Sequence, residues 1–105
     1  MTTQINEPRV SAKGLKVLHA FIEAGNRELS GADIAQRTGI LSGTLYPILI
    51  RFRSAGWLKD RWEDDEPVEL GRPKRRYYKL TAAGHAAYRK NLPTAAPSGS
   101  LAWAR

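Results

Sequence analysis

Apolar residues in the first half of the chain recur at intervals of three and four, the spacing of helices that bury one face. A first helix is expected after Ser11, a good N-cap, and it ends at Gly25 and Asn26. Its buried stripe is predicted to consist of Leu15, Leu18, Phe21 and Ile22.

A second, shorter helix is predicted between Ser30 and Gly39. Ser30 and Asp33 have the spacing of a capping box, in which each side chain accepts a backbone N–H of the other residue. Ile34 and Ala35 turn inward, and Gly39 supplies the left-handed residue that ends many helices.

A third helix is predicted from Ser42 to Ala55, with Ser42 as its N-cap. The apolar positions of this helix repeat at i, i+3, i+4 and i+7, namely Leu45, Ile48, Leu49 and Phe52. At about 100° per residue, the residues pointing away from that face are Gly43, Pro47, Ile50 and Ser54. Thr44, Tyr46, Arg51 and Arg53 flank them. The short turn between the second and third helices is typical of a helix-turn-helix.

After Gly56 the apolar period shortens to two and aromatic residues become frequent. Residues 57–62 and 75–80 are strand candidates, joined by a Pro- and Gly-containing loop into a hairpin with a long tip. Thr81 caps a fourth helix that Pro93 ends. The predicted fold class is mainly α with a small β-hairpin, a winged helix-turn-helix in the order helix, helix, helix, strand, strand, helix.

Polar and breaker-rich segments flank this pattern and set the expected domain bounds. Residues 1–9 form a flexible N-terminal arm, residues 10–92 the domain, and residues 93–105 a tail with Pro, Ser and Gly. The aromatic residues Trp57, Trp62, Tyr77 and Tyr78 are expected to lie in the core or to cover the sheet.

Composition argues against several functional classes. The chain has no cysteine and only two histidines, so neither a metal site nor a disulfide framework is expected. No nucleophile–base pair, paired carboxylates or phosphate loop appears, so we expect neither an enzyme nor a cofactor. No apolar run approaches the ~20 residues that cross a bilayer, and a cytoplasmic protein is expected.

Charge is distributed unevenly along the chain. Seventeen Lys and Arg and ten Asp and Glu give a net charge of +7. Five of the acids fall within residues 63–69, a segment without a base, so the remainder carries 17 minus 5, or +12. Such a surface attracts polyanions. The acidic segment is expected on the outer flank of the hairpin loop, or screening the basic cluster until DNA displaces it.

Three stretches resemble the PadR family of bacterial transcriptional regulators: residues 43–47, residues 55–58 and residues 75–84. The resemblance covers about residues 12–90. It implies a winged-helix fold, regulation of promoters through a dyad-symmetric operator, and a homodimer whose cleft binds a small-molecule effector. It also implies that residues 42–55 are the recognition helix and that the loop ending at Lys74 and Arg75 is the wing tip.

The predicted DNA-binding residues come from the exposed face of the third helix and from the basic run of the hairpin. They are Ser42, Gly43, Thr44, Tyr46, Pro47, Ile50, Arg51, Arg53, Arg72, Lys74, Arg75 and Arg76. The helix is expected in the major groove, and the basic hairpin on phosphates or in the minor groove.

Two other functions fit the same pattern. An architectural or excisionase-like accessory protein would bend DNA, and a winged-helix interaction module would turn its basic face toward an acidic protein. For a homodimer, the candidate contacts are the first helix with the arm, the fourth helix, and the tail around Trp103.

Overall fold

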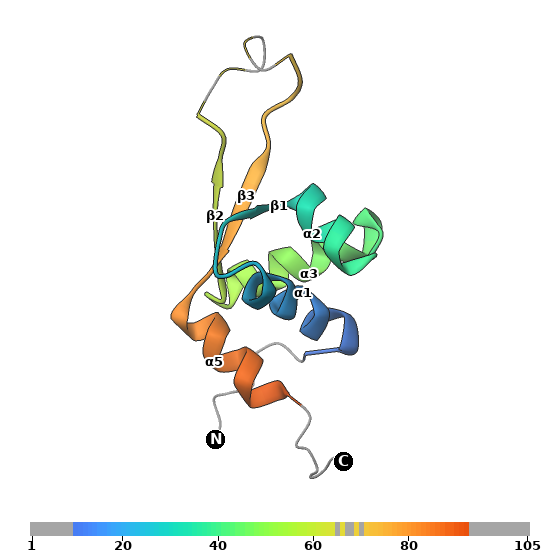
Figure 1. Ribbon diagram of the computed structural model, residues 1–105, viewed down its shortest axis with the longest axis vertical. Helices are drawn as coiled ribbons and strands as arrows, with labels where there is room; N and C mark the ends of the chain where they lie inside the picture. Colours follow the sequence, from blue (N-terminus) through green and yellow to red (C-terminus); the bar gives the residue numbers. More distant parts are fainter. Residues whose placement is uncertain (1–9, 65, 67–68, 70, 93–105) are drawn as a thin grey trace.

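Four helices and a three-stranded sheet make up the computed structural model, which describes residues 10–64, 66, 69 and 71–92. The elements are α1 (Ala12–Glu23), β1 (Leu29–Ser30), α2 (Gly31–Thr38), α3 (Ser42–Ser54), β2 (Leu58–Trp62), β3 (Arg76–Leu80) and α5 (Ala82–Asn91) (Figure 1). The predicted winged helix-turn-helix order is confirmed, and β1 is an addition to it. The expected arm (residues 1–9) and tail (residues 93–105) lie outside the described residues.

Three of the predicted N-caps form. Ser11 accepts the Gly14 N–H at 3.0 Å, and Thr81 accepts the Gly84 N–H at 3.0 Å. Ser30 and Asp33 make both bonds of a capping box, each 3.0 Å long. These bonds fix where α1, α2 and α5 begin, because they satisfy N–H groups that have no partner inside a helix.

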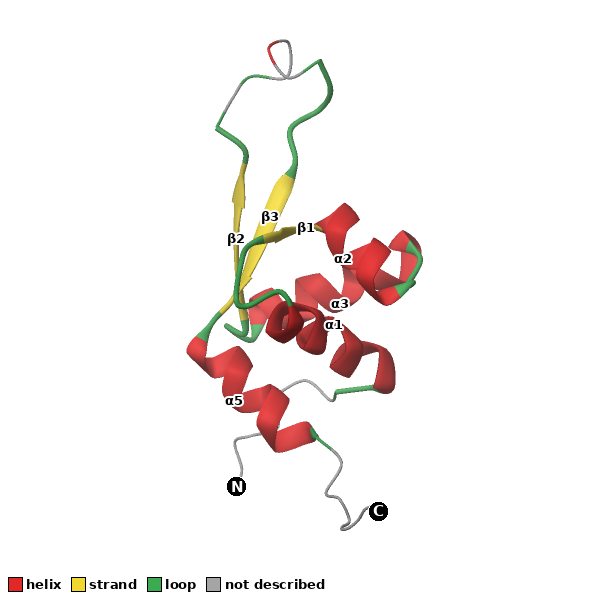
Figure 2. Ribbon diagram, in the orientation of Figure 1, coloured by secondary structure: helices red, strands yellow, loops and turns green. Residues whose placement is uncertain are grey.

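The sheet is antiparallel in the order β1–β3–β2, and its register divides the side chains between two faces. Leu58 lies opposite Leu80, Asp60 opposite Tyr78, and Trp62 opposite Arg76, so these six residues share one face. Leu58, Tyr78 and Leu80 are buried there. The β2–β3 hairpin with its loop, which we call the wing, extends well beyond the helices (Figure 2).

The core lies between α1, α3 and the inner part of the sheet. Its largest fully buried side chains include Phe21, Phe52, Leu18, Ile34, Leu45 and Leu49. The four inward positions predicted for α3 are all buried, which confirms the division of that helix into two faces.

The predicted stripe of α1 is displaced. Leu15 and Ile22 are only partly buried, whereas Val17 and Leu18 are fully buried. The stripe begins at Gly14 because the ring of Phe52 packs there, with its Cζ 3.1 Å from where a Cβ would stand. Gly14, Val17, Leu18 and Phe21 therefore take the i, i+3, i+4 and i+7 positions.

Helix α5 lies against α1, on the side of the molecule away from the wing (Figure 1). The Thr81 hydroxyl donates to the Gly56 carbonyl at 2.6 Å, and the Thr81 N–H donates to the Trp57 carbonyl at 3.0 Å. The Tyr88 hydroxyl lies 2.6 Å from Nδ1 of His19 on α1. The α3 and wing surfaces are thereby left uncovered by α5.

Candidate nucleic-acid interface

The outward face of α3 is open to solvent. Ser42, Gly43, Thr44, Tyr46, Pro47, Ile50 and Arg51 are exposed, and Arg53 is half-buried. Ile50 is 53% exposed and Tyr46 45%. Because the opposite face is filled by the core, this surface is available to a ligand.

The start of α3 differs from the prediction. Leu41 is the N-cap, no side chain caps the helix, and Ser42 is its first helical residue. The turn determines this shift: Gly39 is left-handed, and the Thr38 hydroxyl accepts the Ile40 N–H at 3.2 Å, which brings Leu41 into the extended cap conformation. The Ser42 hydroxyl therefore makes no hydrogen bond to any described residue and is free for an external partner.

Pro47 is the sixth residue of α3, beyond the first turn. Since proline has no N–H, the carbonyl of Gly43 loses its usual intrahelical donor. Both residues lie on the exposed face, where water can satisfy that carbonyl. The early part of the helix thus presents unpaired polar groups together with Ser42 and Thr44.

Glu63 organises the stem of the wing. Its carboxylate accepts two bonds from the Arg72 guanidinium, at 2.8 and 2.9 Å, and one from the Arg75 N–H at 2.9 Å. The Tyr77 hydroxyl donates to it at 3.4 Å. The bonds from Arg72, and then the one from the Arg75 backbone, lower the pKa of Glu63 to about 2. Glu63 is therefore ionised at neutral pH and holds both sides of the stem together.

Asp60 connects the wing to α3. Its Oδ2 lies 2.7 Å from Nε of Arg76 on β3 and 3.3 Å from Nη1 of Arg53 on α3. The Arg76 guanidinium also lies over the ring of Trp62, 5.0 Å from its centroid. Trp62 is 52% exposed, so its prediction as a core or sheet-covering residue was wrong.

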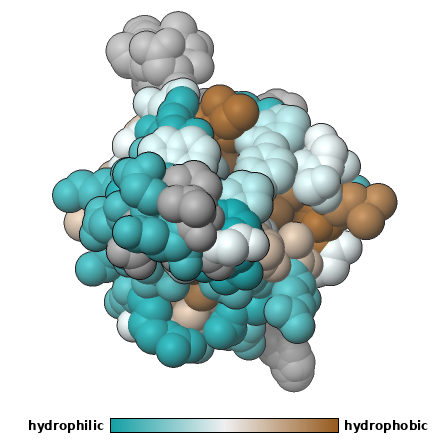
Figure 3. Space-filling model, turned by 90° about the horizontal axis from the view of Figure 1, so that it is seen from above, coloured by the Kyte–Doolittle hydropathy of each residue, from teal (hydrophilic) through white to brown (hydrophobic). Residues whose placement is uncertain are grey.

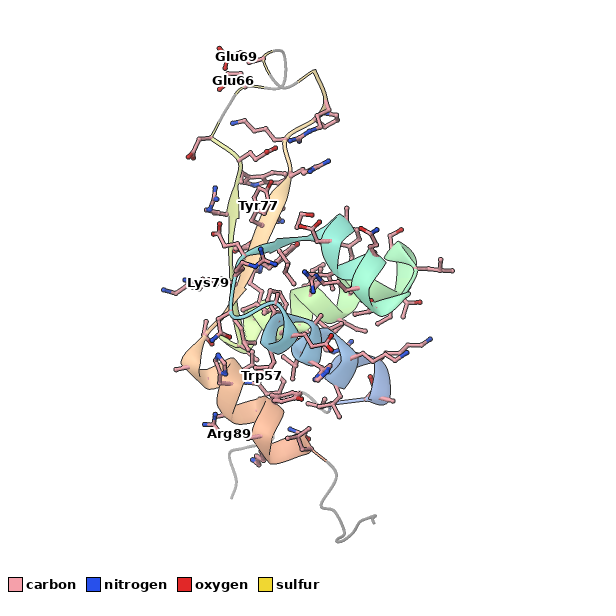
Figure 4. All side chains as sticks on the ribbon, viewed as in Figure 1. Trp57, Glu66, Glu69, Tyr77, Lys79 and Arg89 are labelled. Carbon is pink, nitrogen blue, oxygen red and sulfur yellow. The ribbon has the colours of Figure 1, made fainter. Side chains whose placement is uncertain are left out.

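Acidic residues occupy the far end of the wing, where Figure 4 shows Glu66 and Glu69. Lys74 lies on the returning side with its Nζ 3.8 Å from Oε2 of Glu66. Arg51 and Arg75 make no ion pair with another described residue. The other four predicted basic residues, Arg53, Arg72, Lys74 and Arg76, are each paired with an acid.

The second face of the wing is a separate surface. Arg61 lies opposite Tyr77 and stacks over its ring, 5.1 Å from the centroid. It also makes two bonds to Glu28, at 2.7 and 2.8 Å, which lower the pKa of Glu28. Tyr77 and Tyr78 lie on opposite faces, as strand alternation predicts.

Exposed apolar side chains interrupt an otherwise hydrophilic surface. Viewed from above the wing, Figure 3 shows separate hydrophobic patches among hydrophilic residues. Among the described residues, the exposed large hydrophobic ones are Leu41, Tyr46, Ile50, Trp62 and Leu92. Leu41 is 81% exposed in the turn before α3, and its exposure was not predicted from the sequence.

Within the described ranges, no helix is long and apolar enough to cross a membrane. Among the same residues, no group of three or more His, Cys, Asp or Glu is placed to hold a metal ion.

Comparison with solved structures identifies the fold. BpsR of Bordetella bronchiseptica, whose DNA binding is regulated by 6-hydroxynicotinic acid, matches with a TM-score of 0.64 and 20% identity, over 83% of this chain and 61% of its own. A mutant of MarR from E. coli, solved with operator DNA, matches with a TM-score of 0.59 and 21% identity, over 77% and 52%. This chain thus spans about half to three-fifths of those proteins.

Smu.1704 from Streptococcus mutans UA159 matches with a TM-score of 0.57 and 31% identity, over 79% of this chain and 76% of its own. No curated protein matches the chain. The profile of the PadR-like transcriptional regulator family matches residues 14–90, which include every helix and strand from the body of α1 to α5. The chain therefore belongs to the PadR-like family of transcriptional regulators.

Proposed function

We propose that the chain is a sequence-specific repressor that binds double-stranded DNA, with α3 in the major groove and the wing against phosphates. The observation that carries this proposal is the division of α3: its apolar face is buried, and the face bearing Ser42, Thr44 and Ile50 is exposed. A helix of these dimensions fits the major groove. In this role the chain binds chromosomal DNA in the cytoplasm and catalyses no reaction.

The residues of α3 have different roles in this proposal. Ser42 and Thr44 hydrogen-bond base edges or phosphates, and Gly43 lets the backbone approach closely. Ile50 packs on a thymine methyl group. Arg51, without an ion pair to a described residue, neutralises a phosphate, while Pro47 stiffens the entry of the helix.

The basic residues of the wing bind phosphates in two ways: some are available directly, and others must first release a carboxylate partner. Arg75 can meet a phosphate without giving up an acid. Arg53, Arg72, Lys74 and Arg76 must exchange their carboxylate partners for phosphates. The acids of the wing therefore lower nonspecific affinity, since every such contact costs an existing ion pair.

Selection of bound duplexes from a random pool tests the proposal, and an enriched inverted repeat is the expected result. Binding without sequence preference but with strong bending would favour the architectural alternative. Failure to bind any duplex at low salt would favour a protein-interaction module and contradict the proposal.

Salt titration of the selected duplex then tests the wing. With six to eight phosphate contacts per dimer, log K against log salt should have a slope of about −5 to −7. Arg75→Gln should flatten the slope by about two, because a dimer loses two contacts at about 0.9 each. Arg61→Gln is the matched control, because Arg61 is already paired with Glu28, at 2.7 Å, whereas Arg75 has no ion pair with a described residue. Equal slopes for the two variants would remove Arg75 from the interface.

Base reading is tested by the same selection. Thr44→Ala and Ile50→Ala should change which bases are preferred while leaving the salt slope unchanged, because neither side chain is charged. An unchanged preference in both variants would contradict base reading by α3.

We infer a homodimer, which an inverted-repeat operator requires. Light scattering on the intact chain and on a version ending at Leu92 tests whether the tail takes part. Equal masses above that of a monomer would assign the contact to α1 or α5, and two monomeric masses would contradict the inference.

A small-molecule effector is the last part of the proposal. A groove of about 380 Å³ lies between α1, α2 and α5, with Leu15 and Ala20 as apolar walls, Lys16 and Arg37 as cations, and one acid, Glu23, 3.4 Å from His19. These groups suit an aromatic acid, and BpsR is regulated by such a compound. Thermal shift measurements with hydroxylated aromatic acids test this. Such a ligand should raise the melting temperature of the wild type but not that of Arg37→Gln. A ligand that stabilises the wild type and Arg37→Gln equally would bind elsewhere.

A further inference from the structure

A notch of about 270 Å³ lies between the recognition helix and the stem of the wing. One wall is the first turn of α2, with Gly31, and another is the side chain of Tyr46 on α3. The wing contributes Lys74, Arg75, Arg76 and Trp62 to the lining of the notch. The notch joins three elements because β1 pairs with β3 and leads directly into α2.

The charge of the notch favours an anion. The basic groups in and beside it are Arg53, Lys74, Arg75 and Arg76. They are opposed by Asp60, which two of them share, and by Glu66, which is 70% exposed and 3.8 Å from Lys74. Glu63, which accepts the Arg75 N–H, is balanced by its own partner Arg72. Four positive charges against two negative ones leave +2. A phosphate diester carries one negative charge, so the notch can neutralise it: Arg75 has no ion pair with a described residue, and Lys74 exchanges its contact with Glu66 for the phosphate.

Tyr46 provides an unused hydrogen-bond donor at the wall of the notch. Its hydroxyl makes no hydrogen bond to any described residue, although the side chain is only 45% exposed. It lies against Gly31, where an added Cβ would stand 2.7 Å from the hydroxyl oxygen. The φ of Gly31 is not in the left-handed region, so its backbone does not require glycine. The space that glycine leaves is filled by the Tyr46 hydroxyl.

The position of the notch indicates which anion it meets. The phosphate backbone of a duplex is the ridge between its major and minor grooves. If α3 enters one groove and the wing reaches toward the next, that ridge passes between them, where the notch lies.

We propose that the notch binds one backbone phosphate of DNA, with the Tyr46 hydroxyl as hydrogen-bond donor, Lys74 and Arg75 as counter-charges, and Gly31 as the residue that keeps the hydroxyl in place. This inference rests on the proposed function, since it assigns one contact within the same complex. In this proposal Gly31 is a positioning residue: it does not contact the phosphate itself, but the absence of a Cβ leaves room for the Tyr46 hydroxyl.

Substitution of Tyr46 on a set of modified duplexes tests this. Each duplex carries one neutral methylphosphonate in place of a phosphate, at successive positions of the selected site. Tyr46→Phe should weaken binding to the unmodified duplex by about tenfold, the effect of losing one hydrogen bond to a charged group. At one methylphosphonate position the wild type should weaken by more than tenfold and Tyr46→Phe by a smaller factor, because both proteins lose the charge contact with Lys74 and Arg75 but only the wild type loses the hydrogen bond. Tyr88→Phe, which removes a hydroxyl on α5, is the control and should bind as the wild type does.

Gly31→Ala tests the positioning role. It should weaken binding as Tyr46→Phe does, and the double variant should be no weaker than either single one, because both changes remove the same contact. Urea unfolding of each variant shows whether it is folded under the binding conditions.

Two results would overturn the assignment while leaving DNA binding intact. One is a Tyr46→Phe protein that binds as tightly as the wild type, and the other is a loss of the same size on every modified duplex. If the wild-type protein binds no duplex, the proposed function fails and this inference fails with it.

Discussion

The Asp60 carboxylate lies 2.7 Å from Nε of Arg76 on the neighbouring strand. The same oxygen lies 3.3 Å from the guanidinium of Arg53, so one acid joins α3 to the wing. Asp60 is 18% exposed, and the two arginines are 36% and 39% exposed. The direction in which the wing leaves the helices therefore depends on a partly buried ion-pair network.

Asp60→Asn should lower the free energy of unfolding by about 1–2 kcal/mol, between the values for exposed and buried ion pairs. The amide keeps the size of the side chain but leaves two guanidinium groups close together without a counter-charge. Urea denaturation measures the change. Glu69→Gln is the control, because it removes one charge from an exposed side chain at the far end of the wing. Equal stability of the two variants would show that the network does not stabilise the fold.

Glu63 makes the order of the wing dependent on pH. Its pKa in the folded protein is about 2, below the ordinary value of 4.5, because the Arg72 guanidinium and the Arg75 N–H stabilise the carboxylate. A carboxylate whose pKa is lowered by folding stabilises the folded state, and its full contribution is present when the pH is above the ordinary pKa. We expect this contribution to be constant above pH 4.5, to decline as the pH falls toward 2, and to be absent below pH 2.

Hydrogen exchange of the Arg75 amide, followed by NMR between pH 6 and pH 2.5, measures this dependence after correction for the intrinsic exchange rate. Protection should fall below pH 4.5 in the wild type. In Glu63→Gln it should be lower throughout and independent of pH. A Glu63→Gln protein that retains the pH dependence of the wild type would assign it to another group.

The helical part of the fold could be predicted because its signals are local. Leu45, Ile48, Leu49 and Phe52 repeat with the helical period, and Ser30 with Asp33 forms the expected capping box. The N-cap of α3 was misplaced by one residue, since the conformation of the Gly39–Leu41 turn, not the side chain of Ser42, determines where the helix begins. The two-residue strand β1 was missed because it is too short to show alternation and forms only on the free edge of β3.

The sequence predicted which residues form the candidate site, but not which basic residue pairs with which acid. The exposed face of α3 follows from helical geometry alone. That Glu63 binds Arg72, and that Asp60 lies between Arg53 and Arg76, depends on the register of the hairpin, which a loop of more than ten residues leaves open. Trp62 was expected in the core or covering the sheet on residue type, whereas it is 52% exposed with the Arg76 guanidinium over its ring.

Two serines at helix starts should respond differently to alanine. Ser30→Ala removes the bond from the Asp33 N–H to the Ser30 hydroxyl, one of the two bonds of the capping box, and should lower the free energy of unfolding by about 1–2 kcal/mol. Ser42→Ala removes no hydrogen bond to a described residue and should change it by less than about 0.5 kcal/mol. Urea denaturation compares them. A loss from Ser42→Ala as large as that from Ser30→Ala would restore Ser42 as the cap of α3.

Two glycines offer a similar contrast in packing. A Cβ at Gly84 would collide with the backbone oxygen of Trp57, and that oxygen cannot move freely because it accepts the Thr81 N–H at 3.0 Å. Gly84→Ala should therefore push α5 away from the sheet and lower the free energy of unfolding by about 1–3 kcal/mol. Gly43 has no atom within 4 Å of its added Cβ, so Gly43→Ala should raise that free energy by about 0.5 kcal/mol through helix propensity.

The two substitutions add the same methyl group to helical glycines, so their difference isolates the contact with Trp57. Thermal unfolding followed by circular dichroism should give Gly84→Ala the lower midpoint and Gly43→Ala the higher one. If α5 could shift without cost, both midpoints would rise, because alanine favours each helix equally. That result would mean that the start of α5 is not fixed by the Thr81 contacts, and the separation of α5 from the proposed DNA-binding face would lose its structural basis.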